Sequence, residues 1–132
     1  KKLKKGEDIL EKNGTLKYYN KDYTYQKHEN GSYAYCSDTR FDESLINEIK
    51  NVDLLYHEAT FLHDLVERAK ETFHSTAKEA GEMARKADVG KLMIGHFSTR
   101  YKNPEVLLEE AKEEFDETIL AVEGETFAVT RP

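Results

Sequence analysis

The sequence predicts an α/β fold, because short apolar runs alternate with segments whose apolar residues have helical spacing. The apolar runs cover residues 33–36, 52–56 and 91–94. In sheets built from such units, the loops at the carboxyl ends of the strands carry the chemistry. Asp38, His57 and His96 fall at these three ends.

Length and composition favour one globular domain. The chain has 132 residues, of which 38% are hydrophobic and 35% are charged. No apolar run approaches the roughly 20 residues that span a bilayer, and no signal peptide is expected because no apolar segment follows the lysine-rich start. The single cysteine, Cys36, cannot form an internal disulfide, which favours a reducing, cytoplasmic setting.

The charge balance bears on nucleic-acid binding. A formal net charge of −6 argues against a surface that binds nucleic acid through bulk charge. The lysines within residues 1–5 could form a local cationic patch or simply a solvated segment.

The first part of the chain is less regular than the rest. We expect a single, partial domain over residues 1–132, with a lead-in over residues 1–31 and a strand–helix core over residues 32–132. In the lead-in, Asn13-Gly14 and Asn30-Gly31 favour turns, and the aromatic stretch between them could hold one or two short strands.

The core elements follow from capping residues and spacing. The aromatic run 33–36 is expected as a buried strand, and Asp42 can cap a helix after it. A second helix is expected after His57, and Thr76 with Glu79 has the spacing of a capping box that opens a third. The apolar positions of these three helices are Leu45, Ile46 and Ile49; Phe61, Leu62, Leu65, Val66 and Ala69; and Ala77, Ala80, Ala84 and Ala87.

The last elements begin after His96. Asn103 and Pro104 suit the cap and first position of a helix that continues to about Phe115. Two closing strands are expected over residues 118–122 and 125–129, separated by a glycine.

Two residues at strand ends could bind metal ions. The Asp38 carboxylate can bridge two divalent cations, although an aspartate after a strand is also a common cap or turn residue. The His96 imidazole suits zinc or manganese if other ligands converge on it, and alternatively it is a loop histidine bonded to backbone.

Other polar residues suit proton transfer or phosphate binding. A Glu58–His74 contact would fix the imidazole tautomer and make His74 a general acid. Arg100, together with Ser98, could contact a substrate phosphate, and the alternative for Arg100 is a surface salt bridge. We interpret His28 and His63 as surface residues, and Ser75 or Thr76 as a helix cap.

Four motifs in this order resemble the ribonuclease Z (tRNase Z) family of the metallo-β-lactamase superfamily. They are Tyr35-Cys36-Ser37-Asp38-Thr39, the stretch from Asp53 to Phe61 that contains His57-Glu58-Ala59-Thr60, His74-Ser75-Thr76, and Gly95-His96-Phe97-Ser98-Thr99-Arg100-Tyr101. The resemblance is specific from Ser32 to about Val129 and looser before that.

The resemblance implies the C-terminal half of an αββα sandwich, with a mixed sheet flanked by helices. It implies a zinc-dependent endonuclease with two metal ions, which removes the 3′ trailer from precursor tRNA by attack of a metal-bound hydroxide. Asp38 would bridge the metals and His96 would bind one of them. Glu58 and His74 would assist proton transfer to the leaving group.

The chain lacks the family's His-x-His-x-Asp-His motif, a further histidine ligand and the tRNA-binding arm. Only Asp38 and His96 match family ligands, whereas a complete site needs about four ligands per metal. We therefore expect the chain alone to be inactive and to bind the catalytic metals weakly or not at all.

Two alternatives remain open. One is another metallo-β-lactamase-fold phosphodiesterase or hydrolase, against which the His-Glu-Ala-Thr and His-Ser-Thr pair argues. The other is a non-catalytic half-domain that acts as a dimerisation module. Because a half-domain would expose a sheet face and strand edges, we expect a homodimer.

Overall fold

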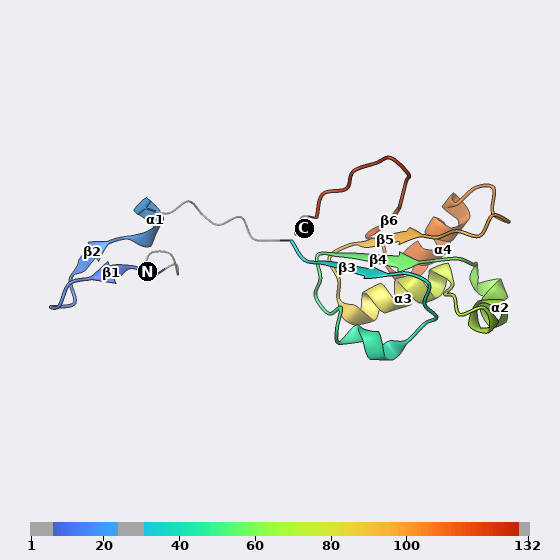
Figure 1. Cartoon of the computed structure of the whole chain (residues 1–132), viewed down its shortest axis with the longest axis horizontal. Coiled ribbons are helices and arrows are strands. Elements are labelled where there is room, and N and C mark those ends of the chain that lie inside the picture. Colours follow the sequence, from blue (N-terminus) through green and yellow to red (C-terminus); the bar gives the residue numbers. More distant parts are fainter. Residues whose placement is uncertain (1–6, 24–30, 130–132) are drawn as a thin grey trace. The chain divides into compact units, whose positions relative to one another are not determined.

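The computed structural model describes residues 7–23 and 31–129. Contacts divide the chain into two compact units, residues 1–30 and 31–132. The first unit contains β1 (Ile9–Leu10), β2 (Leu16–Tyr18) and α1 (Asn20–Tyr23) (Figure 1). The two strands are antiparallel, and Gly14 between them has a φ of +82°, which confirms the turn predicted at Asn13-Gly14.

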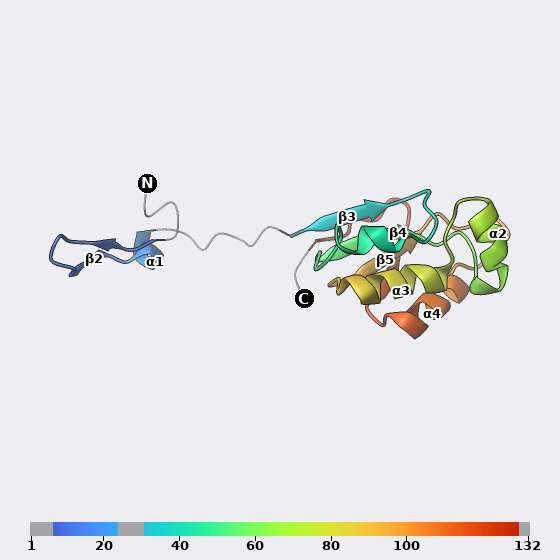
Figure 2. The same ribbon diagram turned by 90° about the horizontal axis from the view of Figure 1, so that it is seen from below.

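The second unit is built on a parallel sheet with the strand order β3-β4-β5-β6. Each strand pairs with the next one along the chain, and crossovers of one hand then place the connecting helices on the same face. Figure 2 shows α3 and α4 together on one side of the sheet. The elements of this unit are β3 (Tyr33–Cys36), η2 (Glu43–Ile46), β4 (Leu54–Glu58), η3 (His63–Leu65), α2 (Val66–Glu71), α3 (Ala77–Ala87), β5 (Leu92–Gly95), α4 (Glu105–Glu114) and β6 (Thr118–Leu120).

The helix α3 forms as its sequence predicts. Thr76 accepts a hydrogen bond from the Glu79 backbone N–H, and the Glu79 side chain accepts one from the Thr76 N–H, so the predicted capping box is present. The four predicted inward alanines of α3 are fully buried in the core. At Gly81 a Cβ atom would lie 2.5 Å from the carbonyl oxygen of Ala111, so this glycine permits the close approach of α3 and α4.

Several predicted elements are shorter than expected. Asp42 caps its element by accepting a hydrogen bond from the Ser44 N–H, but only the 3-10 turn η2 follows. The helix expected after His57 is divided into η3 and the short α2. Asn103 accepts a hydrogen bond from the Glu105 N–H at the start of α4, as predicted.

The strand predicted over residues 125–129 is wrong, because those residues have no regular structure. The 118–122 prediction is confirmed in part by β6, which is also the last strand of the described sheet. The short apolar run over residues 127–129 is therefore insufficient to form a strand where no described strand pairs with it.

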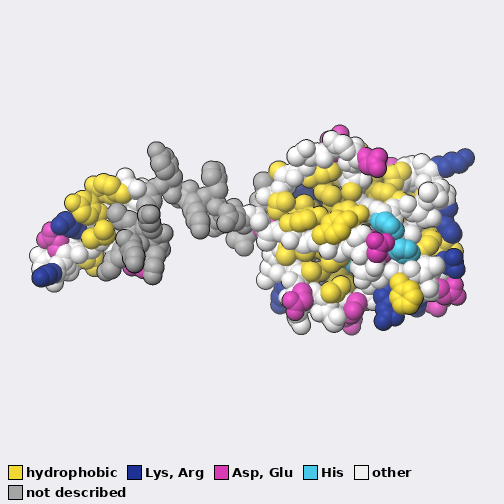
Figure 3. Space-filling model, viewed as in Figure 1, with side chains coloured by type: hydrophobic (Ala, Val, Ile, Leu, Met, Phe, Trp, Pro, Cys, Tyr) yellow, Lys and Arg dark blue, Asp and Glu magenta, His cyan; other side chains and the backbone are white. Residues whose placement is uncertain are grey.

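One face of the sheet carries exposed aromatic residues. Tyr33 and Tyr35 in β3 are 51% and 62% exposed, so the expectation of a buried strand is wrong for these side chains. The Tyr35 and Tyr56 rings stack with centroids 4.5 Å apart. Only Ala34 and Cys36 of β3 pack against the core, because the helices lie on their side of the sheet. Hydrophobic side chains accordingly gather on the surface over this part of the sheet (Figure 3).

Candidate active site

The predicted site residues lie at one edge of the parallel sheet. Glu58 ends β4 and pairs with Gly95, so that His96 follows immediately beside it. Asp38 lies two residues beyond the end of β3, the next strand in the sheet. His74 joins this edge through a bridge between Phe61 and Thr76. The predicted placement of Asp38 and His96 just beyond the carboxyl ends of strands is confirmed.

Three of these side chains could hold a metal ion. Potential ligand atoms of Asp38, His74 and His96 all lie within 4.8 Å of one another. The His96 Nε2 atom is 3.3 Å from the Asp38 Oδ1 atom, and the two imidazole rings have centroids 5.1 Å apart. The group is accessible, since the Asp38 side chain is 72% exposed and that of His96 is 41% exposed. Figure 3 shows histidine side chains and an acidic side chain together on this surface.

The backbone at the site is strained. Asp38 has a φ of +50° and His96 a φ of +60°, in the left-handed region that few residues other than glycine adopt. Phe73, directly before His74, also has a φ of +60°. Such conformations cost about 1–3 kcal/mol each and occur frequently at functional sites. Asn51 and Asp88 have the same conformation outside the site, so positive φ by itself does not mark a function, but at or next to the three candidate ligands it fixes the backbone that carries them.

The Glu58 carboxylate organises the inner part of the site. Its side chain is fully buried. The Oε1 atom accepts hydrogen bonds from the Thr39 N–H at 2.8 Å and from His74 Nδ1 at 2.9 Å. The Oε2 atom accepts from the Thr60 hydroxyl at 2.6 Å and from the Ser75 N–H at 3.1 Å. The predicted Glu58–His74 contact is thus present, and it leaves the His74 Nε2 atom for other interactions.

His57 lies in the interior of β4 rather than at its end. Its side chain is fully buried, and Nδ1 lies 2.8 Å from the Glu58 carbonyl oxygen, to which an Nδ1–H donates. The Nε2 atom has no hydrogen-bond partner in the part of the chain that the structure describes. Burial lowers the pKa of His57, so the neutral ring is favoured. His57 is therefore a core residue and lies outside the group that could hold a metal.

Arg100 and Ser98 form the outer part of the site. The Arg100 Nε–H donates to the Ser98 hydroxyl at 3.2 Å, and the guanidinium group lies 5.0 Å from the Phe61 ring centroid. The same ring packs edge-on against His74, with centroids 6.2 Å apart. Arg100 and His74 thus contact one aromatic side chain. The part of the chain that the structure describes gives Arg100 no salt bridge, which was the alternative role.

Thr60 is a site residue that the sequence analysis missed. Its hydroxyl lies 2.6 Å from Glu58 Oε2, 2.8 Å from His96 Nδ1 and 3.0 Å from the His96 carbonyl oxygen. Thr60 lies two residues beyond the end of β4, and its place in the His57-Glu58-Ala59-Thr60 motif was an available sequence indication. The His63 interpretation was incomplete, because its Nδ1 lies 3.0 Å from the Thr76 hydroxyl and its ring is half-buried. His28 lies outside the described residues.

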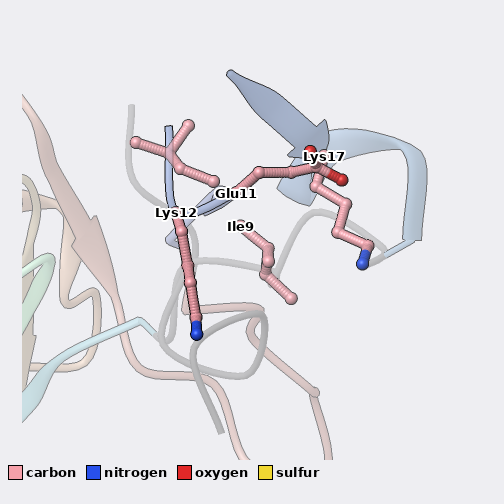
Figure 4. A pocket seen from close by; sticks show the side chains of 5 residues that line it. Ile9, Glu11, Lys12 and Lys17 are labelled. Carbon is pink, nitrogen blue, oxygen red and sulfur yellow. The ribbon is translucent and has the colours of Figure 1, made fainter. Parts of the chain in front are cut away.

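A surface hollow lies in the first unit, on the β1–β2 hairpin (Figure 4). The residues that line it are Ile9, Leu10, Glu11, Lys12 and Lys17. None of the predicted catalytic, metal or phosphate residues is among them, so the hollow adds nothing to the site.

Comparison with known proteins finds relatives named ribonuclease Z. The chain is 47% identical over 128 residues to a protein named ribonuclease Z from Cytophaga hutchinsonii, covering 97% of the chain and 41% of that protein. It is 60% identical over 91 residues to ribonuclease Z from Porphyromonas gingivalis, covering 69% of the chain and 30% of that protein. The chain is a relative of part of ribonuclease Z. No protein-family model matches it.

Solved structures support the same relationship. The metallo-β-lactamase fold protein YhfI from Bacillus subtilis matches with a TM-score of 0.60 and 29% identity, covering 65% of the chain and 35% of that protein. The short form of human tRNase Z matches with a TM-score of 0.51 and 28% identity, covering 64% of the chain and 27% of that protein. The predicted α/β fold with a helix-flanked sheet of the metallo-β-lactamase type is confirmed, except that the sheet described over residues 31–129 is parallel rather than mixed. The chain spans about four tenths of the ribonuclease Z from C. hutchinsonii, which fits the prediction of a C-terminal portion.

The residues fit a metal ion of the kind that this fold implies. Carboxylate and imidazole groups together suit zinc and other divalent transition metals. Because His74 Nδ1 contacts Glu58 and His96 Nδ1 contacts Thr60, both Nε2 atoms remain as potential ligands beside Asp38. The described residues provide three such ligand groups, fewer than one zinc ion with four ligands requires.

Proposed function

We propose that this chain forms the C-terminal part of an endoribonuclease that removes the 3′ trailer from precursor tRNA. The observation that supports this most strongly is the joint position of Asp38, His74 and His96 over the buried Glu58. Sequence identity of 47–60% to proteins named ribonuclease Z supports the same reaction class.

Separate residues would bind the metal ions and the substrate phosphate. Asp38 and His96 would hold divalent metal ions, two per complete site, and we propose zinc as the metal. When bound, these ions would stabilise negative charge at the phosphorus and activate water. Arg100, with Ser98, would contact the substrate phosphate by charge-assisted hydrogen bonds.

Proton transfer falls to His74. Glu58 accepts the Nδ1–H hydrogen bond of His74, which orients the ring and leaves Nε2 as the atom from which a proton would be donated. As water oxygen bonds to phosphorus and the bond to the 3′ oxygen breaks, His74 would donate that proton to the 3′ oxygen. The tRNA then ends in a 3′-hydroxyl group and the trailer keeps the phosphate.

The assignment of roles can be tested in the full-length protein. His74→Ala should lower the rate of precursor cleavage by about 100-fold or more while metal content is retained. Asp38→Ala should lose metal as well as activity. Metal analysis beside a cleavage assay decides between the roles, and equal metal loss in both variants would contradict the general-acid role of His74.

We propose that the 132-residue chain alone is inactive and binds zinc weakly, because the ligand groups described here are too few. Calorimetric titration of the chain with Zn²⁺ should give no tight site. Two tight sites in the chain alone would overturn this proposal.

A second function remains within the same fold. The match to YhfI, a metallo-β-lactamase fold protein that is not named as a tRNase, supports the alternative of another hydrolase with this fold, such as one that acts on small phosphodiesters. Assaying the full-length protein on precursor tRNA and on bis(p-nitrophenyl) phosphate separates the two. Rapid cleavage of the small ester without cleavage of precursor tRNA would favour the alternative.

We also propose that the chain forms a homodimer. The exposed Tyr33 and Tyr35 and the sheet-edge strands β3 and β6 support association, because unpaired edges and apolar patches favour it. Light scattering at high concentration should give twice the monomer mass, and a monomer mass would contradict the proposal. If the chain is instead a non-catalytic dimerisation module, it would also form a dimer. In that case the full-length protein would not cleave precursor tRNA.

We propose a cytoplasmic location. The single, half-buried Cys36 supports a reducing compartment, and burial raises the pKa of its thiol. Among the described residues, no helix is long and apolar enough to cross a membrane. Fractionation of cells that produce the full-length protein tests the location, and recovery in a membrane fraction would contradict it.

A further inference from the structure

The hydroxyl group of Thr60 connects the two halves of the site. It lies between the Glu58 carboxylate, at 2.6 Å, and His96 Nδ1, at 2.8 Å. Thr60 is 6% exposed, so surrounding protein fixes this arrangement. The Glu58–His74 pair and the Asp38–His96 pair are therefore parts of one hydrogen-bonded network.

The donors in this network follow from the number of protons available. A threonine hydroxyl has one proton and can accept through its lone pairs. Two acceptors compete for this proton, Glu58 Oε2 at 2.6 Å and the His96 carbonyl oxygen at 3.0 Å, and the shorter contact is the length expected of an O–H donor to a carboxylate. With its proton directed there, the Thr60 oxygen can only accept from the His96 ring. The His96 Nδ1 atom must then carry the proton.

This choice of tautomer determines the outer face of the His96 ring. In the neutral ring with its proton at Nδ1, the Nε2 atom of His96 presents a lone pair. It faces the Asp38 Oδ1 atom at 3.3 Å, so that two acceptors meet. A cation that binds both acceptors is favourable. In the other tautomer, the Nε2–H group of His96 would donate a hydrogen bond to Asp38 and would not bind a cation. The Thr60 hydroxyl thus keeps the Nε2 atom of His96 ready for a metal ion.

We propose that Thr60 is a positioning residue through which Glu58 sets the tautomer and ring orientation of His96. Glu58 contacts Nδ1 of His74 directly and Nδ1 of His96 through Thr60, so one buried carboxylate orients both rings, and Nε2 of His96 faces Asp38. The catalytic meaning of this device rests on the proposed function. The hydrogen-bond relay itself belongs to the 132-residue chain.

A hydroxyl-specific test separates this role from simple packing. Thr60→Val keeps the shape of the side chain but removes the hydroxyl, whereas Thr60→Ser keeps the hydroxyl. Thr118→Val is a matched control, because Thr118 is also buried and its hydroxyl donates to the Phe115 carbonyl away from the site. Thr60→Ala is used in place of the valine variant if that variant does not fold.

The first readout is the tautomer of His96 in the metal-free chain. Nitrogen-15 NMR of the imidazole rings at pH 8.5 should show the Nδ1–H tautomer for His96 in the unaltered chain, in Thr60→Ser and in Thr118→Val. Thr60→Val should shift His96 towards the Nε2–H tautomer. An unchanged His96 spectrum in Thr60→Val would overturn the proposal, as would Nε2–H in the unaltered chain.

The second readout is zinc affinity in the full-length protein. Loss of a group that orients a metal ligand typically weakens binding by about 10- to 100-fold. Thr60→Val should show a loss of this size, while Thr60→Ser and Thr118→Val should bind zinc like the unaltered protein. Equal losses in Thr60→Val and Thr118→Val would show only a packing role and would overturn the proposal.

The two readouts also separate this inference from the proposed function. If the full-length protein fails to cleave precursor tRNA, the proposed function fails, but the tautomer measurement still decides the role of Thr60. If cleavage and zinc binding are present while His96 keeps its tautomer in Thr60→Val, only the inference about Thr60 fails.

Discussion

The inner and outer parts of the site differ sharply in burial. Glu58 is fully buried and Thr60 is 6% exposed, and every Glu58 oxygen accepts two hydrogen bonds. The Asp38 side chain, by contrast, is 72% exposed, and its contact within the described residues is with His96. The inner part is fixed by the fold, while the outer part remains accessible to ions and substrate. The buried side chains of Glu58 and Thr60 thus orient the exposed side chains that could bind an ion.

The largest expected effect of a single change is in the inner part. Glu58→Gln replaces one acceptor oxygen with an NH₂ group. In place of Oε2 this group would face the donors of Thr60 and Ser75. In place of Oε1 it would face those of Thr39 and His74. We expect the free energy of unfolding of the chain to fall by about 3 kcal/mol, since buried donors lose their acceptor. Urea titration measures this change.

A control for that change lies on the surface of α4. Glu109 is exposed, and Glu109→Gln should alter the free energy of unfolding by less than about 0.5 kcal/mol. Equal free energies of unfolding for Glu58→Gln and Glu109→Gln would contradict a stabilising role of the Glu58 carboxylate.

An intermediate effect is expected from pH, through His57. Burial lowers the pKa of this histidine below its ordinary value of 6.5, while nearby Glu58 and Glu79 oppose that shift in part. The unfolded chain therefore binds a proton at His57 more readily than the folded chain. The resulting stability is complete above about pH 6.5 and is lost as pH falls below it, with a slope of at most about 1.4 kcal/mol per pH unit.

Urea titrations between pH 7.5 and 5 measure that slope. His57→Asn keeps an N–H donor for the Glu58 carbonyl but has no titrating group, so its slope over the same range should be smaller. A slope as steep as that of the unaltered chain would assign the pH dependence to other residues.

The smallest effect on stability is expected in the outer part. Asp38→Asn keeps a residue that tolerates positive φ and changes an exposed side chain, so the free energy of unfolding should change by less than about 0.5 kcal/mol. Thermal unfolding of the chain tests this. A loss comparable to that of Glu58→Gln would remove the distinction between the two parts.

Local sequence patterns predicted the elements that depend on neighbouring residues. The Thr76–Glu79 capping box and the inward alanines of α3 are confirmed, because both follow from spacing within one helix. Predictions failed where the outcome depended on distant partners. The strand expected over residues 125–129 is absent and Tyr35 is exposed, since strand pairing and the side covered by helices are tertiary properties.

For the site, the sequence by itself determined which side chains stand at the carboxyl ends of strands. Asp38 and His96 could be named because each follows an apolar run, whereas His57 was expected at the third end, which Glu58 occupies. Only the tertiary structure decided that the Thr60 hydroxyl lies between Glu58 and His96, a residue 36 positions away. Strand register and helix packing set such distances, and the spacing of apolar residues in the sequence does not contain this information. The role of Thr60 in orienting a ligand could therefore be recognised only in the folded chain.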